Sequence, residues 1–169
     1  MFEQGSLIMY GSIGVCRVED VAPMAGSRGA DKNRLFYKLS PVYGSGTIYV
    51  PVDTKIFMRP ILSHDEALDL IHRIPEIQEL DDESSKDWHS LTVTYQERIH
   101  SHDCEDLVSL IKAVYSKTHS GSENGKRPYK IDQEFKKRAE ELLHSELSAS
   151  LDIPLDEVPR FIAQELKEA

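Results

Sequence analysis

The stretch TIYVPVDTKIFMRPILSHDEALDLI, residues 47–71, contains the predicted change from β-strands to α-helices. Its first part, residues 47–52, is rich in β-branched and aromatic side chains and therefore predicts a strand. Pro51 indicates that this strand ends there or lies at the edge of a sheet, because proline cannot donate to a central ladder. Ser63 stands three residues before Glu66, a capping-box pattern that predicts the start of a helix. The chain is therefore expected to change from strands to helices between these two points.

Three further strands are predicted upstream of this stretch. They cover residues 7–10, 13–18 and 36–39, which are apolar or β-branched, and a polar, glycine-containing segment at 23–34 predicts a loop. Short strands that succeed one another closely, with no helix between them, are typical of a small, strongly bent sheet or barrel. A module of about sixty residues buries little apolar surface by itself, so it is expected to pack against the helical part of the chain.

Downstream of Ser63 the apolar residues recur at helical spacing and predict about five short helices. Their apolar positions are Ala67, Leu70 and Ile71; Trp88, Leu91, Tyr95 and Ile99; Leu107, Val108, Leu110, Ile111, Val114 and Tyr115; Ile131, Phe135, Ala139, Leu142, Leu143 and Leu147; Val158, Phe161, Ile162 and Leu166. Asp103 is placed to cap the third helix, and the composition of residues 119–127 predicts a loop before the fourth. The predicted fold class is α+β: a small N-terminal β-barrel at 1–61, then an all-α domain at 62–169.

The charge of the chain is unevenly distributed. The formal net charge is −9 and the pI is about 5.2, which argues against a generally basic surface that coats nucleic acid. Residues 1–61 carry seven Lys/Arg against five Asp/Glu, and residues 112–138 carry eight against three. Residues 62–111 and 139–169 are strongly acidic. One small cationic window therefore lies inside the acidic half of the chain.

Motifs of enzymes and of metal or cofactor sites are missing from the sequence. It contains no GxxxxGK[ST], GxGxxG, HExxH or GxSxG pattern. His100, His102 and Cys104 lie close together, but alternate residues on a helix point apart and no fourth ligand has suitable spacing. Cys16 and Cys104 cannot form a disulfide framework and are expected to be small core residues. No secretory signal and no apolar run long enough to span a membrane is visible, so we expect a reduced, cytoplasmic protein that is not an enzyme.

Trp88, the single tryptophan, allows two interpretations. It comes directly after a polar segment and opens a predicted helix, where it could be a buried anchor or an exposed aromatic tip that contacts bases. Lys126, Arg127 and Lys130 could hold phosphates beside it or simply lie on a solvated face. On physical grounds alone the buried anchor is favoured.

The order of these features resembles the CarD/CdnL family of bacterial transcription regulators, whose first domain is shared with the transcription-repair coupling factor. The residues that carry the resemblance are Phe2, Gly5, Ile8, Tyr10, Gly14 and Val15; Phe36 to Leu39; Ile48 to Val52; Arg59; Asp87 and Trp88; Tyr95 and Arg98; Asp106 to Val108, Val114 and Tyr115; and Phe135 to Leu147. Together they span essentially the whole chain.

The resemblance implies a specific function. The first domain would be a Tudor-like barrel that binds the β subunit of RNA polymerase by adding a strand edge, here Ile48, Tyr49 and Val50. The helical domain would contact promoter DNA at the upstream edge of the −10 region, where Trp88 would wedge into the minor groove and stabilise the open complex. Lys86, Lys126, Arg127 and Lys130 are the candidate phosphate contacts. Binding to DNA alone would be weak, and the protein would be a cytoplasmic monomer associated with the nucleoid through the polymerase.

The sequence departs from the family pattern in three regions. Gly11 and Ile13 replace a proline and a histidine after the first tyrosine, and Tyr49 stands where some relatives carry an arginine that contacts polymerase. The basic residues that many relatives place soon after the tryptophan are replaced here by His89, Ser90, Leu91 and Val93. The alternative from another class is a Tudor-like adaptor whose helical domain binds a protein and never DNA.

Overall fold

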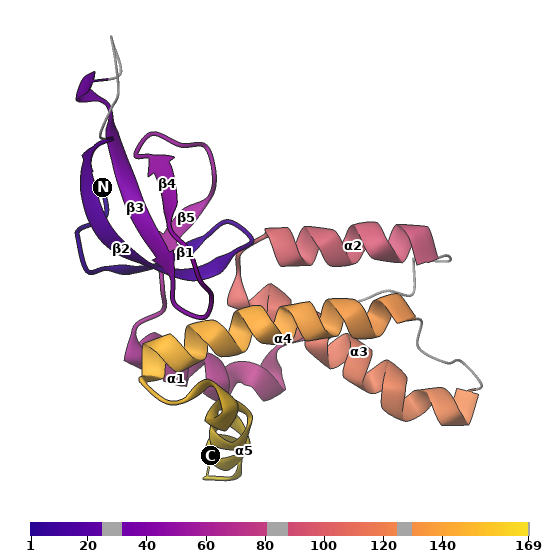
Figure 1. The fold of residues 1–169 in the computed structure, drawn as a ribbon. Coiled ribbons are helices and arrows are strands. Elements are labelled where there is room, and N and C mark those ends of the chain that lie inside the picture. Colours follow the sequence, from indigo (N-terminus) through magenta and orange to yellow (C-terminus); the bar gives the residue numbers. More distant parts are fainter. Residues whose placement is uncertain (25–31, 81–87, 125–129, 169) are drawn as a thin grey trace. The chain divides into compact units, whose positions relative to one another are not determined.

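The computed structural model describes residues 1–24, 32–80, 88–124 and 130–168 (Figure 1). The chain divides into two compact units, Met1–Leu62 and Ser63–Ala169. The first is a five-stranded antiparallel sheet, and the described residues of the second form five α-helices and two short 3-10 helices. The α+β class predicted from the sequence, with the strands first and the helices second, is therefore confirmed.

The strands of the first unit are β1 (Leu7–Tyr10), β2 (Gly14–Pro23), β3 (Leu35–Pro41), β4 (Ile48–Pro51) and β5 (Met58–Pro60). They lie in the order β4-β3-β2-β1-β5, so β4 and β5 are the two edges. The ladders of the described residues do not join these edges, and the closed barrel expected from the sequence is not confirmed. β5 was not predicted, because only three residues form it and its pairing with β1 is a long-range contact.

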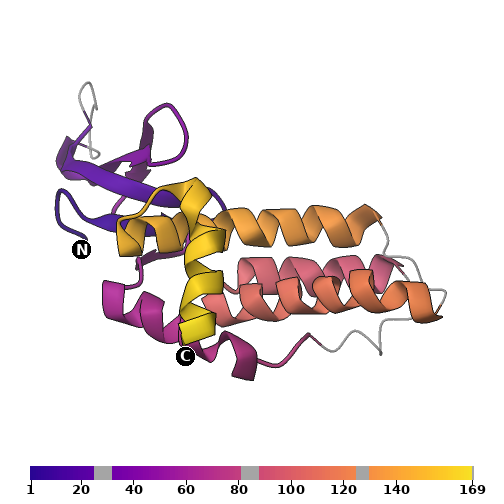
Figure 2. The ribbon, with the colours of Figure 1, turned by 90° about the horizontal axis from the view of Figure 1, so that it is seen from below.

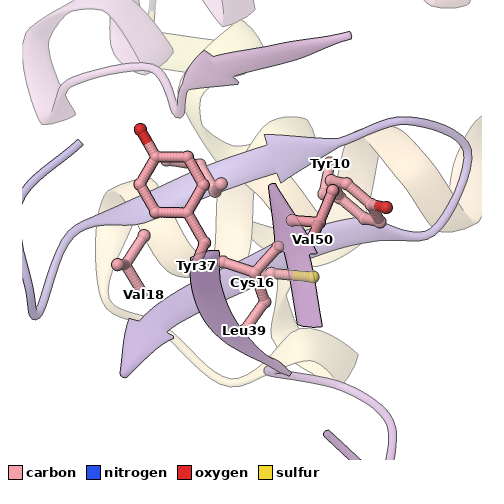
Figure 3. Close-up of a cluster of buried hydrophobic side chains, with 7 residues drawn as sticks. Tyr10, Cys16, Val18, Tyr37, Leu39 and Val50 are labelled. Carbon is pink, nitrogen blue, oxygen red and sulfur yellow. The ribbon is translucent and has the colours of Figure 1, made fainter. Parts of the chain in front are cut away.

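One face of this sheet forms the core of the first unit (Figure 3). Its fully or nearly fully buried side chains come from β1, β2, β3 and β4: Ile8, Tyr10, Cys16, Val18, Tyr37, Leu39 and Val50. Burial raises the pKa of the Cys16 thiol to about 11, so this thiol is protonated at neutral pH. The prediction that Cys16 is a core residue is confirmed.

Gly11, in the turn between β1 and β2, is required by the backbone. Its φ of 47° lies in the left-handed region, and a Cβ built on it would stand 3.1 Å from Cγ2 of Ile56. The N–H of Gly11 donates to the C=O of Phe57 over 2.8 Å. The turn is thereby tied to the segment that leads into β5.

The second unit contains α1 (His64–Arg73), α2 (Trp88–His100), α3 (Cys104–Asn124), α4 (Lys130–Leu151) and α5 (Val158–Glu168), with η2 (Ile74–Glu76) and η3 (Leu155–Glu157) between them. α2, α3 and α4 run side by side, and α5 crosses near the end of α4 (Figure 2). Tyr95, Leu110 and Leu147 are among the fully buried side chains. None of the helices in the described ranges combines the length and apolar character needed to cross a membrane.

The boundaries of these helices confirm two predicted caps and correct one predicted loop. The side chain of Ser63 accepts from the N–H of Glu66, and that of Asp103 accepts from the N–H of Glu105 over 2.9 Å. The loop expected at 119–127 is wrong in its first part, because α3 continues to Asn124. Serine and glycine have weak helix propensity, so composition alone predicted a loop there. Residues 125–127 lie outside the described residues.

Replacement of Ser63 by alanine should lower the free energy of unfolding of the helical unit by about 1 kcal/mol, because the first turn of α1 loses its side-chain acceptor. Chemical denaturation followed by far-UV circular dichroism measures the change. Ser63→Asp, which restores an acceptor, should recover the loss. An alanine variant as stable as the wild type would show that water replaces the cap at no cost.

Candidate functional site

β4 forms one edge of the sheet, and its register with β3 decides which backbone groups point outward. Lys38 pairs with Tyr49, and the N–H of Val52, just after β4, donates to the C=O of Leu35 over 3.1 Å. Because inward and outward groups alternate along an antiparallel ladder, the N–H and C=O of Tyr49 point to the open edge. Pro51 has no N–H, so Tyr49 carries the outward donor of β4.

Two rows of side chains cross the outer face of the sheet beside this edge. The pairings place Asp20, Lys38 and Tyr49 in one row, and Ala22, Phe36 and Pro51 in the next. All of them except Pro51, together with Pro23 and Met24, line a cavity of about 440 Å³. The cavity is therefore an apolar recess that carries one cationic and one acidic side chain, and it lies directly beside the edge strand.

The charges around this recess are partly neutralised. The guanidinium of Arg34 lies 3.2 Å from a carboxylate oxygen of Asp53 and 5.8 Å from the centre of the Phe36 ring. One oxygen of Asp20 accepts from the N–H of Val21 over 2.8 Å. Lys38 is exposed and forms no ion pair within the residues that the structure describes.

The three predicted polymerase-binding residues differ in what they expose. The side chain of Tyr49 is on the surface, with 54% of the residue accessible. Val50 is 4% accessible and belongs to the core, and Ile48 is partly buried against it. Of the three, only Tyr49 offers both its side chain and its outward backbone groups to a partner.

The predicted DNA-binding residues lie at the starts of two helices or outside the described residues. Trp88 is the first residue of α2, and its side chain is not described. Lys130 is the first residue of α4, and its side chain is 92% exposed and lies 3.8 Å from Glu134. Lys86, Lys126 and Arg127 fall outside the described residues. α2 and α4 pack against each other.

A buried polar cluster in the helical unit was missed by the sequence analysis. Asp132, in the first turn of α4, is fully buried and accepts from the hydroxyl of Tyr95 over 2.6 Å. The ammonium of Lys117 lies 3.3 Å from the same carboxylate oxygen. An aspartate in a first helical turn is common on exposed helices, so its type and position gave no signal of burial.

His, Cys, Asp and Glu are the side chains that most often hold metal ions in proteins. No cluster of three His, Cys, Asp or Glu side chains in the described ranges has the geometry to hold a metal ion. Cys104 is buried, and its sulfur lies 3.2 Å from a carboxylate oxygen of Glu146. This contact places Cys104 inside the helical core, as the sequence predicted.

Comparison with known proteins agrees with the geometry of the first unit. Residues 2–62 match the model of the CarD-like/TRCF RID domain family. Among curated proteins, none matches the chain significantly. The matched residues coincide closely with the unit Met1–Leu62, which contains the whole sheet and the recess beside β4. The likeness to the CarD-like/TRCF RID domain family is therefore one of the N-terminal unit, residues 2–62.

Proposed function

We propose that the chain is a transcription regulator that binds RNA polymerase through its N-terminal unit. The family of that unit supports this function, since CarD-like RID domains indicate transcription factors that interact with RNA polymerase. The observation that carries the proposal is the edge strand β4, whose Tyr49 directs an N–H and a C=O outward beside an apolar recess. A strand of the polymerase β subunit adds to this edge, and the recess receives side chains that flank the added strand.

The helical unit contacts promoter DNA at the upstream edge of the −10 region in this proposal. Trp88 wedges into the minor groove, and Lys130, with Lys86, Lys126 and Arg127, holds nearby phosphates. The net charge of −9 makes independent DNA binding weak. Binding to polymerase raises the local concentration of the helical unit at the promoter, so a small cationic surface is sufficient.

The proposal includes no catalytic step and no cofactor. The protein acts as a cytoplasmic monomer that reaches the nucleoid with the polymerase. The competing function is an adaptor that uses the same sheet edge but binds another protein through its helices. The two functions differ in one respect that can be measured: only the first changes the stability of the open promoter complex.

Replacement of Tyr49 by proline should weaken binding to purified cognate RNA polymerase core enzyme about tenfold, because the outward donor of β4 is lost. Proline is tolerated at an edge position whose N–H faces away from the sheet, so the fold should persist. Tyr49→Ala keeps the N–H and removes only the side chain. Biolayer interferometry with both variants measures the two contributions separately.

The outcomes of this experiment assign the binding mode. A proline variant much weaker than the alanine variant supports addition of a strand to β4. Equal losses would assign the affinity to the Tyr49 ring, and wild-type protein that fails to bind polymerase would overturn the proposed function. Polymerase binding without any effect on promoter opening would favour the adaptor.

A further inference from the structure

The buried carboxylate of Asp132 joins three helices of the second unit at one point. Its Oδ1 accepts from the hydroxyl of Tyr95 in α2 at 2.6 Å and lies 3.3 Å from the ammonium of Lys117 in α3. Asp132 itself is 0% exposed and stands in the first turn of α4. Hydrogen bonds to a buried charged group are strong and directional, so they fix the separations of these helices.

Two further contacts surround this cluster. The ring of Phe135, one turn beyond Asp132, lies 5.4 Å from that of Tyr95. The amide of Gln133 donates to the hydroxyl of Thr118 over 3.1 Å, which is a second tie between α4 and α3. Two neighbouring residues of α3, Lys117 and Thr118, thus each contact the start of α4.

The position of the cluster relates it to the residues proposed to contact DNA. Tyr95 lies two turns after Trp88 on α2, about 10 Å along the helix axis. Asp132 lies two residues after Lys130 on α4, and Lys117 lies in the last two turns of α3. The cluster therefore connects the middle of α2, two turns after Trp88, with the first turn of α4, which carries Lys130.

We propose that Asp132 is a positioning residue: through Tyr95 and Lys117 it fixes α2 as a whole, and so Trp88 at its first position, in relation to the start of α4, with Lys130. This inference rests on the proposed function for its consequence at the promoter. The effect of Asp132 on the position of α2 can be measured without that function. Trp88 is the only tryptophan of the chain, so its fluorescence reports on the start of α2.

The test uses Asp132→Asn in the full chain, a change that keeps an oxygen acceptor for Tyr95 and removes the charge that attracts Lys117. Acrylamide quenching of Trp88 fluorescence should change measurably, and the lifetime of the open complex should fall about threefold to tenfold. Affinity for polymerase should not change, because the first unit is untouched. The matched control is Ser148→Ala, which removes a buried hydroxyl donor to Ile153 about 24 Å further along α4.

Ser148→Ala should leave the quenching of Trp88 fluorescence and the lifetime of the open complex as in the wild type. This should hold even if it lowers the unfolding midpoint as much as Asp132→Asn does. Equal effects of the two variants, or wild-type quenching in Asp132→Asn, would overturn the positioning role. If Trp88→Ala itself leaves the lifetime unchanged, the proposed function fails. The positioning role is then decided by the quenching comparison alone.

Discussion

Replacement of Trp88 by alanine should shorten the lifetime of the open promoter complex about 30-fold, equivalent to roughly 2 kcal/mol. Trp88 opens α2, and an indole inserted beside an unstacked base step stabilises the opened duplex by filling space that would otherwise re-close. The alanine side chain cannot fill this space. Competitor-challenge experiments on promoter DNA with purified cognate polymerase measure the lifetime directly.

Binding of the chain to polymerase should be unaffected by this change, because the proposed function assigns that binding to β4 in the other unit. Val93→Ala provides the matched control, since Val93 is an apolar residue of the same helix and is 45% accessible. It should leave the lifetime within about twofold of the wild-type value. A lifetime in Trp88→Ala equal to that of the wild type, with polymerase binding intact, would contradict the wedge.

The parts of the fold that depend on local chemistry were predictable from the sequence. Ser63 and Glu66 marked the start of α1 because a cap is satisfied within one turn, and Pro51 marked the end of β4 at an edge because proline lacks a donor. β5 was missed since its three residues become a strand only by pairing with β1, some fifty positions earlier in the chain. The β propensity of a short segment does not predict pairing with a distant strand.

In the candidate sites, too, local features were predictable from the sequence and features that depend on distant residues were not. Tyr49 could be singled out from the resemblance, but the recess beside it depends on the register of β2, β3 and β4 and could not be read from the sequence. Asp132 gave no signal because Tyr95 and Lys117, which make its burial possible, lie 37 and 15 positions away. Buried polar residues are recognised from their partners, and the partners are known only once the helices are packed.

Replacement of Lys117 by methionine should lower the free energy of unfolding of the helical unit by about 3 kcal/mol, because it removes the cationic partner from a buried carboxylate. Asp132 is fully buried, whereas the side chain of Lys117 is 29% exposed. The loss of unfolding free energy should therefore be larger for Lys117→Met than for Asp132→Asn. Asp132→Asn leaves an ammonium that can turn toward water, so its cost should be about 1 kcal/mol. Urea unfolding followed by circular dichroism measures both.

Lys112→Met is the control for this asymmetry, since Lys112 belongs to the same helix and its ammonium donates to the carbonyls of Ile74 and Ile77 over 2.9 and 2.6 Å. Its loss leaves neutral carbonyl groups rather than a buried charge, so it should cost about 1 kcal/mol. A double replacement of Lys117 and Asp132 by apolar residues of similar size should regain most of the stability lost in Lys117→Met. Equal costs for Lys117→Met and Lys112→Met would mean that the carboxylate of Asp132 does not depend on its cationic partner.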